Sequence, residues 1–447
     1  MKILWLTWKD RANPQAGGAE LVAAELAQRL VKDGHELVFL TASFPKAKHR
    51  EFHELPAEPP RRISALEAAS SDPSTLNSQL STKKGFWIIR VGGRVTVYWH
   101  AFKYFKKHLT DWPDVIIEEV NTVPFFSNFY PLFSKKPSTS TSTKTAHVRP
   151  ARILFFHMLC RRIWFHEIFF PLSLVGYIIE PIYIRLLGHP PVITVSESSR
   201  QDLTKYGFKP GSTHLISEGI EVNPVEDLAK VDKFPEPTIL SLGAIRSMKR
   251  TLEIVQAFEL AKKQLPNLKL KLVGEPYGSY GKRVLGYVGN SPYRADIEVL
   301  GRVELQDKIN IMRQSHLILV TSIKEGWGLI VTEAASQGTP AVVYNVDGLR
   351  DSVRHDKTGV VCQTNNPETL SQETVNLLKD QKRYEKLQRA AWDWSKEITF
   401  DQSYRDFKEI LGPATAEEAT ASAQLDDSES QATVDSPNPP ELTMNEA

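Results

Sequence analysis

Cysteine, zinc-type spacing and long hydrophobic runs are all scarce in this 447-residue chain. The two cysteines, Cys160 and Cys362, lie far apart and belong to no Cys-x-x-Cys or Cys/His pattern. We therefore expect buried thiols in a reducing compartment, not a disulfide framework or a structural zinc. Two long uncharged runs, 120–133 and 168–179, fall short of the roughly 18 residues that a membrane-spanning helix needs. The apolar start breaks off at Lys9, too early for a signal peptide, so we expect a cytoplasmic protein.

Positive and negative charge are separated along the sequence, although the net charge is only +2. Residues 1–222 hold 28 Lys and Arg against 20 Asp and Glu, a net of +8, whereas 413–447 hold eight acidic residues and no basic one. The basic part suits an anionic ligand or the acidic lipid of a membrane surface, and the alternative is an ordinary solvated surface. The acidic end is too poor in apolar residues to fold, so we expect a disordered tail. We expect no nucleic-acid partner.

Short apolar runs alternate with amphipathic segments in two blocks of the sequence. In the first block, apolar runs at 2–7 and 36–41 flank a segment with apolar residues at helical spacing, 19–32. The alternation stops in a Pro- and charge-rich stretch at 223–237 and starts again at 238. Such alternation is typical of a parallel sheet covered by helices on both faces. The sequence therefore predicts an α/β protein with two doubly wound, Rossmann-like domains.

Changes in composition predict the limits of these parts. We place a first domain at 1–222, a hinge at 223–237, a second domain at 238–394, a last amphipathic helix at 395–412 and the tail at 413–447. Within the first domain, the polar stretches 45–85 and 134–150 predict mobile loops with little regular structure. The segment 95–98 has the character of a strand, and a basic helix is expected at about 100–109.

The strongest motif is the string Glu325-Gly-Trp-Gly-Leu-Ile-Val-Thr-Glu333. It predicts a glycine-containing turn after a strand, followed by a helix. The carboxyl end of a strand in an open parallel sheet faces the ligand crevice, and the free N–H groups at Leu329 and Ile330 predict an anion site for a diphosphate. Glu325 and Glu333 lie on either side of this site, where one can bind a sugar hydroxyl and the other the ribose hydroxyls. Taken singly, they have ordinary alternatives: a surface residue and a helix-dipole partner.

This motif resembles the Glu-x7-Glu motif of the family 4 retaining glycosyltransferases, which have the GT-B fold. The resemblance extends over about 1–412 and includes Gly17-Gly18-Ala19-Glu20, 119–126, Phe156-His157, 195–198 and 301–303. It implies two domains that face each other across a cleft, with the last helix crossing back to the first domain. It also implies retaining transfer of a sugar from a nucleotide sugar, UDP- or GDP-linked, to a glycan, lipid-linked or other hydroxyl acceptor. Polysaccharide or glycolipid synthesis is the expected setting.

The resemblance implies a role for each matching residue. Glu325 would contact the donor sugar, Glu333 the nucleotide ribose, and His157 would stand beside the sugar at the reacting centre. Gly17 and Gly18 would pack their backbone against the donor diphosphate from the first domain. Further candidates are Arg302 and Val303 for the base, and Asn121 and Arg162 for the acceptor.

The cations expected at the diphosphate depart from the family pattern at one position. Lys249 matches the family lysine, but Ala244 occupies the place of the usual arginine, and we expect Arg246 to deliver the guanidinium instead. Cations and helix N–H groups can stabilise a departing nucleoside diphosphate without a metal. The chain has no Asp-x-Asp, the signature of the metal-dependent GT-A enzymes. We therefore predict neither a metal nor a cofactor.

Two questions stay open at the level of sequence. The aromatic, basic segment 161–187 either docks at a membrane interface or packs within the first domain. The competing functions are a GT-B nucleotide-sugar epimerase and a nucleotide-sugar-binding protein without turnover, the second of which is favoured by the missing arginine at Ala244.

Overall fold

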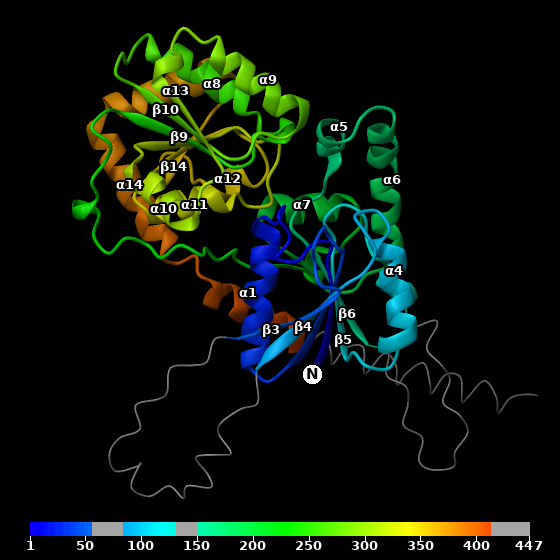
Figure 1. Cartoon of the computed structure of the whole chain (residues 1–447). Helices are drawn as coiled ribbons and strands as arrows, with labels where there is room; N and C mark the ends of the chain where they lie inside the picture. The colour runs from blue at the N-terminus through cyan, green and yellow to red at the C-terminus, as the bar shows by residue number, and fades with distance from the viewer. Residues whose placement is uncertain (56–83, 131–149, 413–447) are drawn as a thin grey trace, which may run out of the picture.

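The computed structural model describes residues 1–55, 84–130 and 150–412. Figure 1 shows two α/β domains, one in blue to teal and one in green to orange, each built around a sheet with helices on both sides. The predicted fold class, two doubly wound domains, is confirmed.

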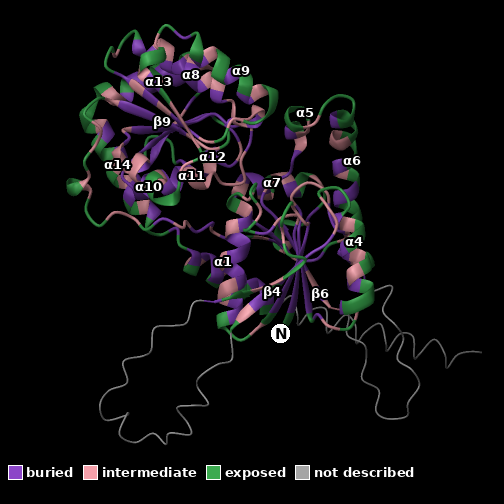
Figure 2. Cartoon of the chain, viewed as in Figure 1, coloured by how far each residue is buried: buried purple, intermediate pink, exposed green. Residues whose placement is uncertain are grey.

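The sheet of the first domain has the strand order β3-β4-β2-β1-β5-β6-β7-β8. Its pairs are parallel except β3–β4, which is antiparallel at the edge. The central strand β5 is buried along its whole length because helices cover both faces (Figure 2). The strands are β1 (Lys2–Leu6), β2 (Glu36–Thr41), β3 (Arg50–Glu54), β4 (Gly85–Arg90), β5 (Val115–Glu119), β6 (Ala151–Phe156), β7 (Val192–Thr194) and β8 (Thr213–Leu215).

Side chains accept hydrogen bonds from backbone N–H groups at the start of two helices of this domain, α1 and α7. At α1, the N–H of Gly17 donates to Glu20 Oε2 at 2.6 Å, and at α7 the hydroxyl of Ser196 accepts from Ser199 N at 3.2 Å. The helices are α1 (Gly18–Lys32), α4 (Val97–Tyr104) with a π-helical turn (Phe105–Leu109), α5 (Trp164–Glu167), α6 (Leu172–Leu186) and α7 (Glu197–Lys205).

The sheet of the second domain is parallel throughout, in the order β11-β10-β9-β12-β13-β14. Its strands are β9 (Thr238–Leu242), β10 (Lys269–Val273), β11 (Ile297–Gly301), β12 (Leu317–Val320), β13 (Ala341–Val343) and β14 (Gly359–Val361). Its helices are α8 (Thr251–Lys262), α9 (Gly278–Gly289), α10 (Leu305–Gln314), α11 (Leu329–Ser336), α12 (Leu349–Ser352), α13 (Pro367–Lys379) and α14 (Gln381–Ser395).

A last helix, from 400 to the end of the described chain at 412, lies against the first domain (Figure 1). Phe407 is fully buried there and stacks on Trp5 of β1, with the ring centroids 6.1 Å apart. Asp33 accepts hydrogen bonds from Tyr404 at 2.9 Å and from Lys408 at 3.0 Å. The end of the described chain therefore completes the core of the domain in which the chain begins.

Two predictions about the first domain are wrong in part. The stretch 45–85 contains the strand β3, a short, charged edge strand held by pairing with β4 and by the contact of Phe52 with Trp87. The segment 95–98 leads into α4 and is not a strand, because helical turns bury Val97 and Ala101 together and this packing outweighs β-branched propensity. The loop predictions at 56–83 and 134–149, and the predicted tail at 413–447, lie outside the described residues.

Candidate functional site

Residues from both domains meet where the carboxyl ends of their strands face each other. His157 follows β6 in the first domain, and the loop 321–328 follows β12 in the second. A Cβ added at Gly326 would lie 2.7 Å from the carbonyl oxygen of His157. The loop of the second domain therefore packs on the backbone of the first at a place where only glycine fits without a shift.

His157 is buried between two carboxylates of its own domain. Its Nδ1 lies 2.8 Å from Glu218 Oε1, and its Nε2 lies 3.2 Å from Glu119 Oε1. Burial opposes the charged imidazole, but the neighbouring carboxylates of Glu119 and Glu218 outweigh burial and raise the pKa of His157 to about 10. The ring is therefore a cation at neutral pH.

The Nε2 atom of this cation is buried and faces Glu119. Within the described residues it has a charged neighbour but no well-directed hydrogen bond. Asn121 lies at the same place, since its Nδ2 donates to Glu119 Oε1 at 3.3 Å. The structure thus brings His157 and Asn121 together through Glu119.

Glu325 is held by a cation and a hydroxyl of the second domain. Its Oε1 accepts from Lys249 Nζ and from Ser322 Oγ, each at 2.5 Å. A Cβ at Gly348, which has φ of 81°, would lie 2.3 Å from the carbonyl oxygen of Glu325. Lys249 and Glu325, which were predicted separately from the sequence, are therefore in direct contact, and a tight glycine turn supports this contact.

The first residues of two helices meet across the domain boundary. A Cβ at Gly18, which begins α1, would lie 2.6 Å from Leu329 Cδ1, which begins α11. Leu329 and Ile330 carry the first N–H groups of α11, which starts after Gly328 in a left-handed conformation. The N-terminal end of a helix favours an anion through these N–H groups and the helix dipole. Two such ends at one place suit a diphosphate.

Glu333 is buried one turn further along α11. Its Oε2 lies 2.7 Å from Lys308 Nζ. Burial raises the pKa of Glu333, and Lys308 opposes that rise.

Near the same end of the sheet, Arg302 Nη1 donates to the carbonyl oxygen of Pro14 at 3.0 Å, whereas Val303 packs against the core of its own domain. Arg302 therefore ties the second domain to the loop before α1.

Arg246 lies in a cavity of about 430 Å³ between the two domains. Its Nη1 is 3.9 Å from Glu167 Oε2, and its Nε is buried without a hydrogen-bond partner among the described residues. Arg162 is exposed on a turn that leads to α5. No hydrogen bond or ion pair within the described chain joins either arginine to His157 or Glu325. The other residues that line the cavity are His166, Glu167, Ser247, Tyr277, Gly278, Ser279, Tyr280 and Arg283.

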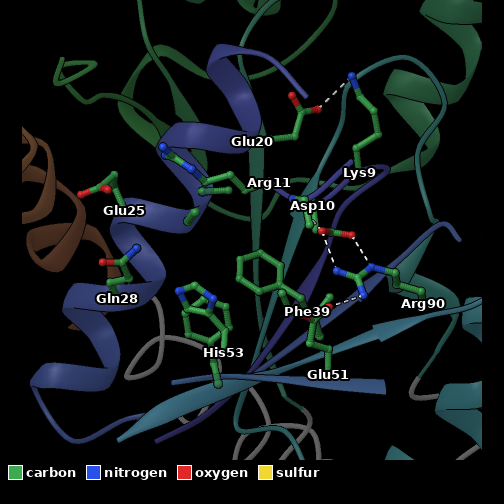
Figure 3. Close-up of a pocket in the computed structure, with 15 residues that line it drawn as sticks. Lys9, Asp10, Arg11, Glu20, Glu25, Gln28, Phe39, Glu51, His53 and Arg90 are labelled. Atoms are coloured by element: carbon green, nitrogen blue, oxygen red, sulfur yellow. Dashed lines mark hydrogen bonds and ion pairs between the residues drawn. The ribbon is translucent and has the colours of Figure 1, made fainter. Parts of the chain in front are cut away.

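A separate cavity of about 330 Å³ lies against α1 in the first domain (Figure 3). Its floor is apolar, with Phe39 and Ile88 from neighbouring strands. Glu20 and Arg90 also line it, and Arg90 donates two hydrogen bonds to Asp10 at 2.8 and 2.9 Å. The cavity therefore has both apolar and charged lining residues.

Sequence analysis missed the side chains that fix the histidine and the domain boundary. Glu119 lies in a string that was singled out, but nothing in the sequence marked Glu218. Across the boundary, buried Lys324 pairs with Asp202 of α7, and Ser198 Oγ donates to Asp351 Oδ2 at 2.5 Å. Ser198 was part of a matching motif, so its place in the sequence gave a signal for a boundary contact. Within 1–55, 84–130 and 150–412, no group of three or more His, Cys, Asp or Glu side chains is arranged to hold a metal ion.

Residues 226–394 match the family model of the glycosyl transferases group 1. The N-acetyl-alpha-D-glucosaminyl L-malate synthase of Bacillus anthracis is 29% identical over 255 residues, which cover 50% of this chain and 64% of that protein. The poly(glycerol-phosphate) alpha-glucosyltransferase of Bacillus subtilis is 28% identical over 173 residues, 36% of this chain and 25% of that protein. These matches span less than two thirds of either relative.

Solved structures with the same fold cover nearly the whole chain. Sucrose-phosphate synthase from Thermosynechococcus elongatus has a TM-score of 0.69 at 16% identity and covers 93% of this chain and 99% of its own. Anabaena HepE in complex with UDP and glucose has a TM-score of 0.63 at 14% identity, with coverage of 92% and 100%. The two facing sheets and the likeness to these structures show that the chain has the GT-B fold, and its residues 226–394 are similar to the group 1 glycosyltransferases.

Proposed function

We propose that this protein transfers a sugar from a nucleotide sugar to a hydroxyl acceptor, with retention of configuration and without a metal. The observation that carries the proposal is the meeting of His157, the Lys249–Glu325 pair and the N-terminal ends of α1 and α11 between the two domains. One place thus offers a hydroxyl-binding carboxylate, cations and helix N–H groups, which is what a sugar diphosphate requires.

The departing nucleoside diphosphate develops negative charge, and fixed donors can stabilise it. In the proposed complex, the N–H groups at Gly18, Leu329 and Ile330 bind the diphosphate. The ammonium group of Lys249 interacts with the phosphate as well as with Glu325, and Glu325 then binds a hydroxyl of the donor sugar. The N–H of Gly17 is already bound by Glu20, so Gly17 supports this arrangement by holding the start of α1 in place.

His157 acts as a cation in this mechanism, since its pKa is raised to about 10 and it is not a base at neutral pH. Its Nε2 donates to the donor sugar or the leaving phosphate. The acceptor hydroxyl attacks the anomeric carbon on the face from which the diphosphate leaves. The bond from that carbon to the diphosphate oxygen breaks, and the departing phosphate takes the acceptor proton.

The remaining assignments belong to the same proposal. Glu333 binds the ribose, Arg302 and Val303 lie on the base side, and Asn121 lies on the acceptor side through Glu119. Arg246 and Arg162 are proposed contacts for the diphosphate and the acceptor that become close only when the domains close on substrate.

The donor and the setting are also proposals. HepE binds UDP and UDP-glucose on the same fold, which supports a UDP-sugar over a GDP-sugar. The acceptor is a glycan or a lipid-linked hydroxyl, as in polysaccharide or glycolipid synthesis. Free, buried Cys160 and Cys362 suit a protein of the cytoplasm, with its basic first domain toward the membrane face.

Binding and turnover of a panel of UDP-, GDP- and ADP-sugars test this function. One donor should raise the thermal midpoint of the full chain and be consumed with release of nucleoside diphosphate. Glu325→Ala and His157→Ala should abolish turnover, whereas exposed His189→Ala and exposed Glu368→Ala serve as matched controls. The enzyme proposal would be contradicted if a donor binds tightly but is not consumed, and if the His157→Ala variant binds that donor equally well.

A further inference from the structure

The first domain exposes a long apolar surface along α6 and the turn before it. Phe169 and Phe170 are 72% and 74% exposed, and all of the other members except Phe165 are aliphatic. Monomeric soluble proteins rarely expose a contiguous apolar surface of this extent. We call it the α6 surface; its members are Phe165, Phe169, Phe170, Leu172, Leu174, Val175, Ile178, Ile179, Ile182 and Leu186.

This surface is one face of a helix that is firmly seated by its other face. Leu172, Val175, Ile179, Ile182 and Leu186 recur at intervals of three and four residues, which places them on one side of α6. On the inner side, Tyr183 and Ile184 pack into the core of the domain.

A buried glutamate fixes the inner side of α6 to the segment that follows His157. Glu180 accepts from the N–H groups of Cys160 and Arg161 at 2.7 Å each, and from Trp164 Nε1 at 3.0 Å. The apolar side is therefore presented outward by a rigid scaffold, and it is joined directly to the loop beside the candidate reacting centre.

The charges around the α6 surface are basic. Between 161 and 187 the acidic residues are Glu167 and Glu180; Glu180 is buried, and Glu167 lies 3.9 Å from Arg246. Arg162 and Arg185 are exposed beside the apolar face.

Helix α4 extends this character along the same edge of the domain, as Figures 1 and 2 show. It exposes Trp99, with Lys103 lying 5.0 Å from the Trp99 ring, and the following turn exposes Lys107. A second copy placed on this surface about a two-fold axis would set basic residues against basic residues. An anionic bilayer complements both the charge and the apolar face.

We propose that the α6 surface docks the protein on an anionic bilayer, with the phenylalanines and the outer side of α6 in the interfacial layer and the arginines and lysines at the lipid headgroups. No helix in the described part of the chain is long and apolar enough to cross the bilayer, so the contact is made from one side. This docking is independent of the proposed sugar transfer. Through Glu180, it places the loop after His157 close to the lipid surface.

Co-sedimentation of the full chain with vesicles tests the docking. The unmodified protein should bind vesicles of phosphatidylcholine with phosphatidylglycerol and bind pure phosphatidylcholine more weakly. Phe169→Ser/Phe170→Ser and Ile178→Ser/Ile182→Ser should each lower partitioning about tenfold, because each removes apolar area from the interface. The control Leu285→Ser/Leu305→Ser changes exposed leucines on α9 and α10 and should bind like the unmodified chain.

A charge variant separates binding to anionic lipid from non-specific hydrophobic adsorption. Lys103→Glu/Lys107→Glu should weaken binding to the anionic vesicles and reduce its salt dependence. All variants change exposed side chains, so thermal midpoints close to that of the unmodified chain verify folding. The proposal is overturned if the unmodified chain binds neither vesicle, or if both α6 variants bind as it does. It is equally overturned if light scattering shows a dimer that the Phe169→Ser/Phe170→Ser change dissociates while vesicle binding stays absent.

Discussion

His157 Nδ1 and Glu218 Oε1 lie 2.8 Å apart and buried, although the two residues are 61 positions apart in the sequence. This contact and the nearby Glu119 raise the pKa of His157 to about 10. The imidazole should therefore remain protonated at pH 8, where an unperturbed histidine, with a pKa of about 6.5, is neutral. Glu218→Gln keeps a hydrogen-bond acceptor but removes one negative charge, so it should lower the pKa of His157. NMR titration of labelled histidine, with His157→Gln to assign the signal, measures both values; titration of the unmodified protein near 6.5 contradicts this assignment.

The same contact predicts how stability depends on pH. The pKa of His157 is higher in the folded state than in the unfolded state, so its charged form is stabilised by folding. That contribution is fully present below about pH 6.5 and is lost as the pH rises through about 10. The difference in the free energy of unfolding between the unmodified chain and His157→Gln should therefore shrink between pH 7 and pH 10. Urea unfolding at several pH values measures it, and a difference that grows with pH would have the wrong sign.

Gly326→Ala tests the packing of the second domain on the first. Its Cβ would lie 2.7 Å from the carbonyl oxygen of His157, a backbone atom that cannot swing aside. The domains should separate by a fraction of an ångström, and turnover should fall by about a hundredfold, since small misplacements at a reacting centre are costly. Gly286→Ala in α9 meets nothing within 4 Å and is the matched control, expected to leave turnover unchanged. Equal activity of the two variants would remove the role given to this contact.

Phe407→Ala tests whether the last helix belongs to the core of the first domain. Phe407 is fully buried and stacks on Trp5, so its truncation should cost about 3–5 kcal/mol in the free energy of unfolding. Lys408→Ala, at the position next to Phe407, removes a half-exposed ion pair with Asp33. It should lower the free energy of unfolding by less than about 1 kcal/mol. Urea unfolding followed by tryptophan fluorescence compares them. Similar small losses in both variants would mean that the helix is only loosely attached.

Sequence patterns predicted the parts of the fold that rest on local periodicity. The strands β2 and β9 lie at the predicted residues, because buried parallel strands are continuous apolar runs. The strand β3 was missed because an antiparallel edge strand with Glu51, His53 and Glu54 has no apolar run to mark it. The helix α4 was taken for a strand at its start because Val95 and Val97 have high strand propensity, and only tertiary packing decides against it.

The candidate site likewise has parts that the sequence could predict and parts that it could not. The turn at 326–328 and the helix start at Leu329 are encoded locally by glycine and helix signals, so the anion site could be anticipated. Glu218 and Lys324 could not, because their partners His157 and Asp202 are far away in sequence and the contacts exist only after folding. The exposed side of α6 could not be distinguished from a packed one either, since both are apolar at helical spacing.

The central claim, retaining transfer from a nucleotide sugar, is tested most directly by following a donor by proton NMR in the presence of the full chain. Incubation with a panel of UDP- and GDP-sugars should release nucleoside diphosphate from one donor. The sugar should appear in a product with the anomeric configuration that it had in the donor, and Glu325→Ala should stop the reaction. An inverted product, a nucleotide sugar isomerised at another carbon without release of the diphosphate, or a donor bound tightly but unchanged would each contradict the claim.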